Sequence, residues 1–352
     1  MATKAAARAE GERIHAAFRA AGALPVEADI LQPAETLLDL YGEDIRARAY
    51  VTADPLRGEM MLRPDFTVPV VQMHMAHGAD PARYAYLGEV FRKQERPSAR
   101  AAEYFQAGYE VFDRDDPTGA DAEVFALFAR LLAPLNLRAA TGDIALLMAA
   151  VRGLNTLPTR KAALLRHIWR PRRFRALLDR YGSARSPRPA PQSAPAPLIG
   201  LRTQAEIDAR LAALAEDAAA APISSEEVAL LDDLLDLSGP SVKALAHLRE
   251  LSAHLPAIGP AVDGMEARLV ALAGRGVDVD ALAFEASHGR TTLEYYDGFV
   301  FSFHAADESL PPVASGGRYD ALTRVLGQGR SIPAVGGVIR PGLVADLGGL
   351  PC

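Results

Sequence analysis

The chain has 352 residues, 49% of them hydrophobic, which is enough for one large domain or two of ordinary size. Its net charge is -6, with 38 basic against 44 acidic side chains, which argues against a surface built mainly to hold nucleic-acid backbones, since that affinity needs clustered Lys and Arg. The single cysteine, Cys352, excludes an intramolecular disulfide and a cysteine-rich zinc site, and we expect no metal.

The N-terminal stretch MATKAAARAEGERIHAAFRAAG has no apolar run of signal-peptide length. Nowhere does the chain hold an uncharged run of about 18 apolar residues, so we expect a cytoplasmic protein without a membrane span. The same stretch carries Ile14, Ala17 and Phe18 among good helix formers, which predicts a helix over residues 2–21 that ends near Gly22.

Short apolar runs bounded by Gly, Pro or Asp predict strands over residues 60–62, 84–91 and 106–112. Between the first two, residues 65–76 predict a helix, with Asp65 or Thr67 as its cap.

After Asp121 apolar residues recur at three- and four-residue spacing, and residues 143–275 are predicted to be helical nearly throughout. Within them residues 183–198, SARSPRPAPQSAPAPL, predict a flexible, solvated loop. Strand patterns return at 281–286 and 298–303.

Strand patterns on both sides of the helical block predict an α+β fold in which one sheet is interrupted by helices. If the early and late strands share that sheet, residues 143–276 form a mainly helical insertion. The core then consists of residues 1–142 and 277–352.

Polar side chains alternate in LRPDFTVPV, residues 62–70. Arg63, Asp65 and Thr67 lie two apart, so an extended segment would point all three the same way. A salt-bridged loop with a helix cap is the alternative interpretation.

The segment FRKQERPSARAAEYFQAGYEVF, residues 91–112, predicts a long hairpin with a basic tip. On its second arm Gln106, Gly108 and Glu110 alternate with apolar residues, which places the amide and the carboxylate on one face. A carboxylate on the inner face of a sheet is costly unless it meets a cation or a hydrogen-bond donor. A solvent-facing strand remains the alternative.

Two later segments carry weaker signals. In SGGRYD, residues 315–320, two glycines precede Arg318 and predict a turn where backbone approaches a ligand closely, although glycine pairs also occur in plain hairpins. In TTLEYYDGFVF, residues 291–301, the pattern also fits a strand that ends in a turn.

Taken together and in order, the four segments resemble the histidyl-tRNA synthetase-like branch of class II aminoacyl-tRNA synthetases, over about residues 25–339. The segment 91–112 is similar to the second class II motif, and LEYYDGFVF and SGGRYD are similar to the two segments most particular to the histidine branch. The resemblance implies a class II synthetase-like antiparallel sheet flanked by helices, and a site for histidine. The matched candidates for histidine binding are Asp65, Thr67, Arg92, Gln106, Glu110, Tyr295, Tyr296 and Tyr319.

By this resemblance Asp65, Thr67 and Gln106 hold the α-amino end of histidine, while Glu110 and Tyr296 contact the imidazole. A carboxylate suits that contact because it accepts from a ring N–H and favours the charged ring. Arg92 and Arg100 match positions that contact an anion or the ligand carboxylate.

The groups that synthetases use for chemistry are replaced. Where the family has Arg-Gly-Leu-Asp before the tyrosine pair, this chain has Thr291 in the arginine column, and Arg290 is one residue out of place. In a strand such a slip turns a side chain to the opposite face.

The third class II motif also departs from the family. Leu343 stands where an arginine stacks on adenine, and we expect the helix there to be disrupted, because Pro341 and Gly342 are poor in a helix interior. Nine residues after Leu343 the sequence ends, so we expect no anticodon-binding domain of about 100 residues.

A synthetase-like core with a helical insertion and without these arginines resembles the regulatory subunits of ATP phosphoribosyltransferase. The resemblance implies no activity of its own, no cofactor, and a hetero-oligomer with a short-form catalytic subunit in the first step of histidine biosynthesis. It also implies feedback by histidine, and a homodimer formed around residues 25–39.

Two other hypotheses remain. The chain could be an active histidyl-tRNA synthetase-like enzyme or an aminoacylating paralog, with Arg290 supplying the missing group. Alternatively it could bind RNA through the hairpin tip and the string RHIWRPRRFR, residues 166–175, although such runs are more often a solvated helix face or a subunit contact.

Overall fold

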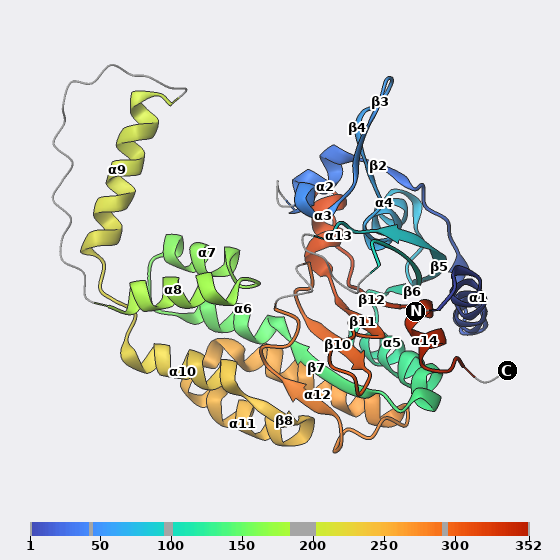
Figure 1. Ribbon diagram of the computed structural model, residues 1–352. Coiled ribbons are helices and arrows are strands. Elements are labelled where there is room, and N and C mark those ends of the chain that lie inside the picture. The colour runs from blue at the N-terminus through green and yellow to red at the C-terminus, as the bar shows by residue number, and fades with distance from the viewer. Residues whose placement is uncertain (1, 42–44, 95–100, 184–201, 291–294, 351–352) are drawn as a thin grey trace.

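A nine-stranded sheet forms the centre of the computed structural model, which describes residues 2–41, 45–94, 101–183, 202–290 and 295–350 (Figure 1). Neighbouring strands are antiparallel except in the pairs β1–β5 and β7–β9. In sheet order the strands are β1 (Leu24–Pro25), β5 (Ala82–Phe91), β6 (Glu103–Phe112), β12 (Ala334–Ile339), β11 (Ala314–Arg318), β10 (Phe299–His304), β7 (Arg138–Asp143), β9 (Ala283–Glu285) and β8 (Ser238–Pro240).

Helices cover the sheet, and a second, three-stranded sheet projects beside it (Figure 1). The small sheet has the order β2 (Leu31–Pro33), β4 (Gly58–Leu62) and β3 (Val51–Asp54). The helices of this part are α1 (Lys4–Ala20), α2 (Ala34–Tyr41), α3 (Ile45–Arg48), α4 (Thr67–His77), α5 (Pro117–Leu132), α13 (Asp320–Leu326) and α14 (Pro341–Asp346), with a 3-10 turn at Ala133–Leu135.

The helical block lies between β7 and β9 in sequence, and β8 within it pairs with β9 at the sheet edge. Because β7 pairs with β10, strands from before and after the block share one sheet, and we propose that residues 143–276 are an insertion in a single α+β core. Its helices are α6 (Ile144–Gly153), α7 (Pro158–Arg166), α8 (Pro171–Gly182), α9 (Gln204–Ala219), α10 (Ser225–Asp236), α11 (Ser241–His254) and α12 (Gly259–Gly274), with a 3-10 turn at Pro256–Ile258.

Aromatic packing fixes α1 and α5 on the sheet. The predicted opening helix is confirmed: Ile14 and Phe18 are fully buried, and the Phe18 ring stacks on Phe128 of α5 with centroids 5.4 Å apart. Just beyond the helix, Gly22 takes the left-handed φ of 97° that glycine adopts without strain. Phe125 of α5 contacts the alternating aromatic side chains of β10, which are Phe299, Phe301 and Phe303.

The predicted α+β fold is confirmed, as are strands overlapping each predicted range and the helix after Asp65. Two local predictions are wrong. Gly316 and Gly317 do not form a turn but lie inside β11. Glycine suits this place in the strand because a Cβ at Gly316 would sit 2.3 Å from the Gly336 carbonyl oxygen on the neighbouring strand. The helix at Pro341 is not disrupted, because proline occupies its first position, where the missing N–H has no partner to lose.

Some predictions fall outside the described residues: the hairpin tip with Arg100, the Thr291 position, and all but the first residue of 183–198. In the described part of the chain no helix has the length and apolar character needed to cross a membrane. Nor does any group of three or more His, Cys, Asp or Glu side chains in that part have the arrangement of a metal site.

Candidate functional site

A buried carboxylate, Glu110 on β6, is the centre of the candidate site and is only 1% exposed. Its Oε1 accepts hydrogen bonds from Thr67 Oγ1 at 3.1 Å and from the Tyr86 hydroxyl at 2.9 Å. Its Oε2 accepts from the Tyr319 hydroxyl at 2.6 Å. Three hydroxyl donors from α4, β5 and the end of β11 therefore converge on one carboxylate, which meets the need for donors that its burial creates.

Glycines on neighbouring strands leave the space that these side chains occupy. A Cβ at Gly336, the β12 residue directly opposite Glu110, would lie 1.4 Å from Glu110 Oε2. A Cβ at Gly108 would lie 2.0 Å from the Tyr86 ring, and one at Gly317 would lie 2.9 Å from the Tyr296 ring. The absence of side chains at these three glycines therefore leaves room on the sheet for Glu110, Tyr86 and Tyr296.

A stack of side chains orients Tyr86. The Phe66 ring stacks on Tyr86 with centroids 4.4 Å apart, and the Arg63 guanidinium lies 4.0 Å from the Phe66 centroid on the other side. Arg63 donates to the backbone carbonyls of Ala28 and Glu89, the latter at 2.8 Å. The extended segment that would point Arg63, Asp65 and Thr67 the same way is not formed, because α4 begins at Thr67.

Burial dominates the electrostatics of Glu110. Desolvation raises the pKa of Glu110 to about 7, although the hydroxyls of Tyr319, Tyr86 and Thr67 favour the charged form. No cation contacts Glu110 among the described residues, and nearby Asp65 disfavours the second negative charge. Near neutral pH the carboxyl is therefore divided between its acid and its carboxylate, and it can donate or accept a hydrogen bond.

The tyrosine pair and Asp65 border the same carboxylate. The Tyr295 hydroxyl lies 3.4 Å from Thr67 Oγ1 and donates to the Tyr296 hydroxyl at 3.5 Å. Burial, followed by the charge of Asp65, raises the pKa of Tyr295, so its hydroxyl stays neutral. Asp65 also accepts a hydrogen bond from the Val68 amide at 3.4 Å, in the first turn of α4.

Gln106 has a buried side-chain oxygen that lacks a hydrogen-bond partner in the described part of the chain. It lies on the same face of β6 as Glu110, is 1% exposed, and its Oε1 has no hydrogen-bond partner among the described residues. A buried amide oxygen without a donor is costly, so an ammonium or hydroxyl donor of a ligand would satisfy it.

Two arginines, Arg92 and Arg340, lie beside the candidate site. Arg92 donates through Nε to the Pro64 carbonyl at 2.9 Å, which ties it to the segment that carries Asp65. Arg340 lies close enough to Arg92 for the two charges to repel, and burial first, then Arg92, lowers the pKa of Arg340. Two cations thus stand near one another beside the candidate site, as an anionic ligand group would require.

Arg290 turns away from this cluster. Its Nε donates to the Ile168 carbonyl at 2.9 Å, and its guanidinium lies 5.0 Å from the centroid of the Phe174 ring. Both partners belong to the helical block, so Arg290 does not lie in the Glu110 cluster, and these contacts lend no support to the hypothesis that it supplies the missing synthetase group.

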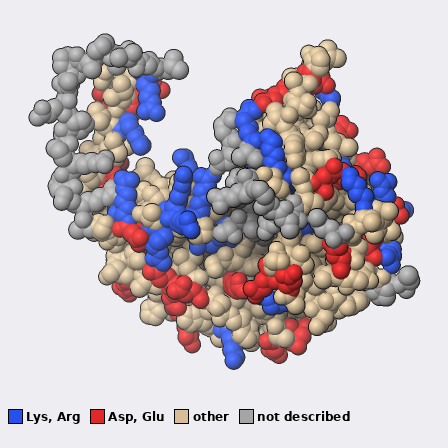
Figure 2. Space-filling model, in the orientation of Figure 1, with Lys and Arg blue, Asp and Glu red and all other residues tan. Residues whose placement is uncertain are grey.

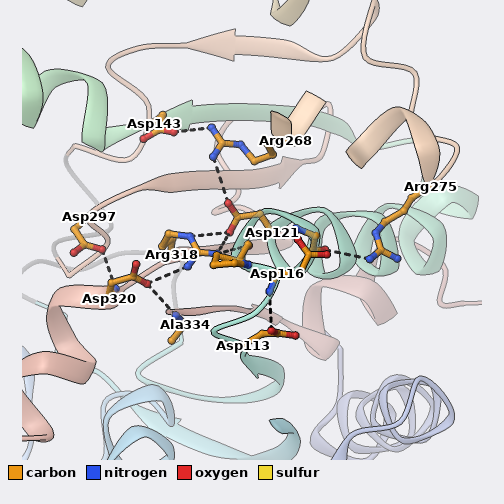
Figure 3. Close-up of polar contacts among 12 residues, drawn as sticks. Asp113, Asp116, Asp121, Asp143, Arg268, Arg275, Asp297, Arg318, Asp320 and Ala334 are labelled. Carbon is orange, nitrogen blue, oxygen red and sulfur yellow. Dashed lines mark hydrogen bonds and ion pairs between the residues drawn. The ribbon is translucent and has the colours of Figure 1, made fainter. Parts of the chain in front are cut away.

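A buried ionic network connects the candidate site to the helical block (Figure 3). Arg318 of β11 binds Asp121 of α5 at 2.7 Å. The other oxygen of Asp121 pairs with Arg268 of α12 at 3.3 Å, and Arg268 also binds Asp143 at 2.6 Å. Arg318, the last residue of β11, reaches this network, while the next residue, Tyr319, reaches Glu110.

Asp297, which follows the tyrosine pair, holds the start of α13. One of its oxygens accepts from the amide of Asp320 at 2.9 Å (Figure 3). The other accepts from the amide of Ala321 at 2.8 Å. Burial and the neighbouring Asp320 raise the pKa of Asp297 to about 6. The two segments most similar to the histidine branch are thus joined directly.

Several of these residues were absent from the sequence-based candidates. Tyr86 could have been found from Gly108, since a glycine inside an apolar strand signals a close approach by a neighbour. Arg268 and Asp121 carried no local signal, because they lie 147 positions apart and meet only through the fold.

Comparisons with known proteins agree over most of the chain. A family model described as histidyl-tRNA synthetase matches residues 2–184 and 203–341. An ATP phosphoribosyltransferase regulatory subunit from Allorhizobium ampelinum is 33% identical, with 91% of this chain and 92% of the relative covered. One from Brucella anthropi is 32% identical, with 88% and 89% covered.

Solved structures are similar in fold. One described as an ATP phosphoribosyltransferase regulatory subunit/histidyl-tRNA synthetase from Bacillus halodurans superposes with a TM-score of 0.71 at 20% identity, covering 99% of this chain and 81% of that one. Histidyl-tRNA synthetase from Nostoc gives a TM-score of 0.66 at 19% identity, covering 97% and 71%.

Proposed function

The chain belongs to the histidyl-tRNA synthetase family and, within it, to the ATP phosphoribosyltransferase regulatory subunits, and on that basis we propose that it is a non-catalytic subunit of that enzyme. It assembles with a short-form catalytic subunit and supports the first step of histidine biosynthesis. The observation that carries the proposal is the 33% identity across 92% of a relative of that name.

The site supports recognition of histidine. A ring N–H would donate to Glu110, the α-ammonium would be held by Asp65, Thr67 and the unpartnered Gln106 oxygen, and the carboxylate would face Arg92. Glu110 accepts three hydroxyl hydrogen bonds of the about four that a carboxylate can accept, and we propose that the ligand N–H takes its place there in exchange for one of the hydroxyls. That exchange gives the protein two arrangements of the same residues, which a regulatory ligand can bias.

The adjacent residues Tyr319 and Arg318 provide a route from the site to the helical block. If the Tyr319 hydroxyl moves when a ligand replaces it on Glu110, the adjacent Arg318 would be displaced as well. Through Asp121 that displacement would reach Arg268 of α12. Buried ion pairs tolerate little displacement, because a charge that loses its partner in the interior is strongly penalised. We therefore propose that feedback by histidine acts by changing the packing of the helical insertion against the core.

Absence of catalysis is supported by the positions that the resemblance makes catalytic. Thr291 and Leu343 cannot supply a guanidinium, and Arg290 is held by Ile168 and Phe174. An active synthetase-like enzyme is the second candidate. Histidine-dependent exchange of pyrophosphate into ATP separates the two: the regulatory subunit gives background exchange, and clear exchange by the purified chain would refute the proposal.

Assembly is tested by gel filtration of the protein mixed with the short-form catalytic subunit from the same organism. We expect a species larger than either component. Elution of the two proteins as separate peaks would contradict the proposal. Alone, the chain is expected to run as a dimer formed around residues 25–39, without bound nucleic acid. We propose the cytoplasm as its location, where the small-molecule substrates of that enzyme are found.

A further inference from the structure

A separate hollow of about 620 Å³ lies between α8 and α10 of the helical block and the segment of the core that carries Ser287 and Arg290. We refer to it as the α8–α10 hollow. Figure 2 shows Lys and Arg side chains gathered near the middle of this face of the molecule, in the region where Figure 1 places α7 and α8. The charged residues that line the hollow are Arg172, Arg175, Asp179, Asp236 and Arg290.

Arg290 has an unmet hydrogen-bonding need in this hollow. It is 5% exposed, its Nε is bound by Ile168, and its Nη2 is buried without an acceptor among the described residues. Burial, followed by repulsion from Arg175, lowers the pKa of Arg290 to about 10. A buried guanidinium with an unpaired N–H is costly; an anion in the hollow would offset the charge of Arg290 and would reach Nη2 after a small movement of the side chain.

Other positive features surround the same space. Arg172 is exposed on the first turn of α8, and no ion pair ties it to another side chain in the described ranges. The 12-residue helix α8 begins at the hollow with no side-chain cap; Pro171 at its first position has no N–H, and the amides of Arg172 and Arg173 that follow have no intrahelical acceptor. Arg175 contributes less, since Asp232 already binds it at 2.6 Å.

Two carboxylates in the hollow indicate which groups the ligand has besides its anion. Asp179 lies further along α8, and Asp236 is the last residue of α10. A bare anion would be repelled by them, whereas hydroxyl groups would donate to them. A hollow of this size holds a ligand larger than a single phosphate.

We propose that the α8–α10 hollow binds a phosphorylated sugar, with the phosphate at Arg290, Arg172 and the start of α8, and sugar hydroxyls at Asp179 and Asp236. The site is distinct from the Glu110 cluster and does not depend on the proposed function.

Ribose 5-phosphate, titrated calorimetrically into the full-length protein, tests the proposal without histidine or a catalytic subunit. We expect saturable binding that Arg172→Ala weakens about tenfold, as loss of a charge-assisted hydrogen bond would. Arg173→Ala is the matched control, since Arg173 is equally exposed on α8 but does not line the hollow. Equal effects of the two substitutions, or no saturable binding up to millimolar ligand, would overturn the proposal.

Asp179→Asn separates the two halves of the ligand. It should weaken ribose 5-phosphate several-fold and leave inorganic phosphate unchanged or slightly tighter, because only the sugar donates to that carboxylate. Binding of inorganic phosphate as tight as that of ribose 5-phosphate by the unmodified protein would contradict the assignment to a sugar phosphate.

Discussion

The Glu110→Gln substitution should remove a specific pH dependence of stability. Glu110 has an ordinary pKa of 4.5, which burial raises to about 7 in the folded chain. Between those values the folded state binds more protons than the unfolded state, so the free energy of unfolding falls as pH rises. Glutamine fills the same volume without titrating; a hydroxyl that faces its amide oxygen can still donate, and one that faces its NH₂ group can rotate to accept.

The magnitude follows from the pKa difference. Each unit corresponds to about 1.4 kcal/mol, so Glu110 should reduce the free energy of unfolding by about 2–3 kcal/mol between pH 5 and pH 8. Asp297, whose pKa burial raises to about 6, acts in the same direction. That contribution cancels when the substituted and unmodified proteins are compared at each pH.

Urea unfolding followed by circular dichroism at pH 5, 6, 7 and 8 measures the effect. The unmodified chain should lose stability relative to Glu110→Gln as pH rises, with most of the change by pH 8. Glu103→Gln on the same strand is the control, because Glu103 is exposed and pairs with Lys4 at the surface. A difference between the unmodified protein and Glu110→Gln that is the same at pH 5 and pH 8 would refute the account of Glu110.

Three further substitutions test the packing around the site. Gly336→Ala should destabilise the fold by about 1–3 kcal/mol or more in urea, because its Cβ would collide with Glu110, whereas Gly264→Ala in open space on α12 should stabilise it by about 0.5–1 kcal/mol. Arg268→Met should lower the free energy of unfolding by about 3–5 kcal/mol in the same assay, because Asp121 and Asp143 each lose an ion-pair partner in the interior. An unchanged free energy of unfolding would contradict the network. Tyr319→Phe should raise the pKa of Glu110 further and shift the pH-dependent loss of stability to higher pH, since its hydroxyl favours the carboxylate; an unchanged profile would argue against that hydrogen bond.

The polar face of β6 was predictable because alternation is a local property. Gln106, Gly108 and Glu110 are fixed on one side by the period of the strand, and the need for donors follows from burying a carboxylate. The identity of the donors was not local: Thr67 and Tyr319 entered through family resemblance, and Tyr86 was missed. Only the register that places β5 beside β6 brings the Tyr86 hydroxyl to Glu110.

Errors arose where one residue type serves two structures. Gly316 and Gly317 predicted a turn because glycine is frequent there, but in β11 they admit close neighbours on both sides of the sheet. Pro341 predicted a broken helix, yet at the first helical position it is favourable. Arg268 could not be assigned at all, because its partners come from α5 and β7 and are united only by the packing of α12.

The most direct test of the central claim is the rate of phosphoribosyl transfer by the short-form catalytic subunit as this protein is titrated in, with and without histidine. The account predicts that the rate rises to a plateau at a fixed ratio of the two chains. It also predicts that histidine lowers the plateau and that Glu110→Ala weakens this inhibition by about 1–3 kcal/mol of histidine affinity, the cost of a lost charge-assisted hydrogen bond. A rate that does not change when the protein is added would contradict the account.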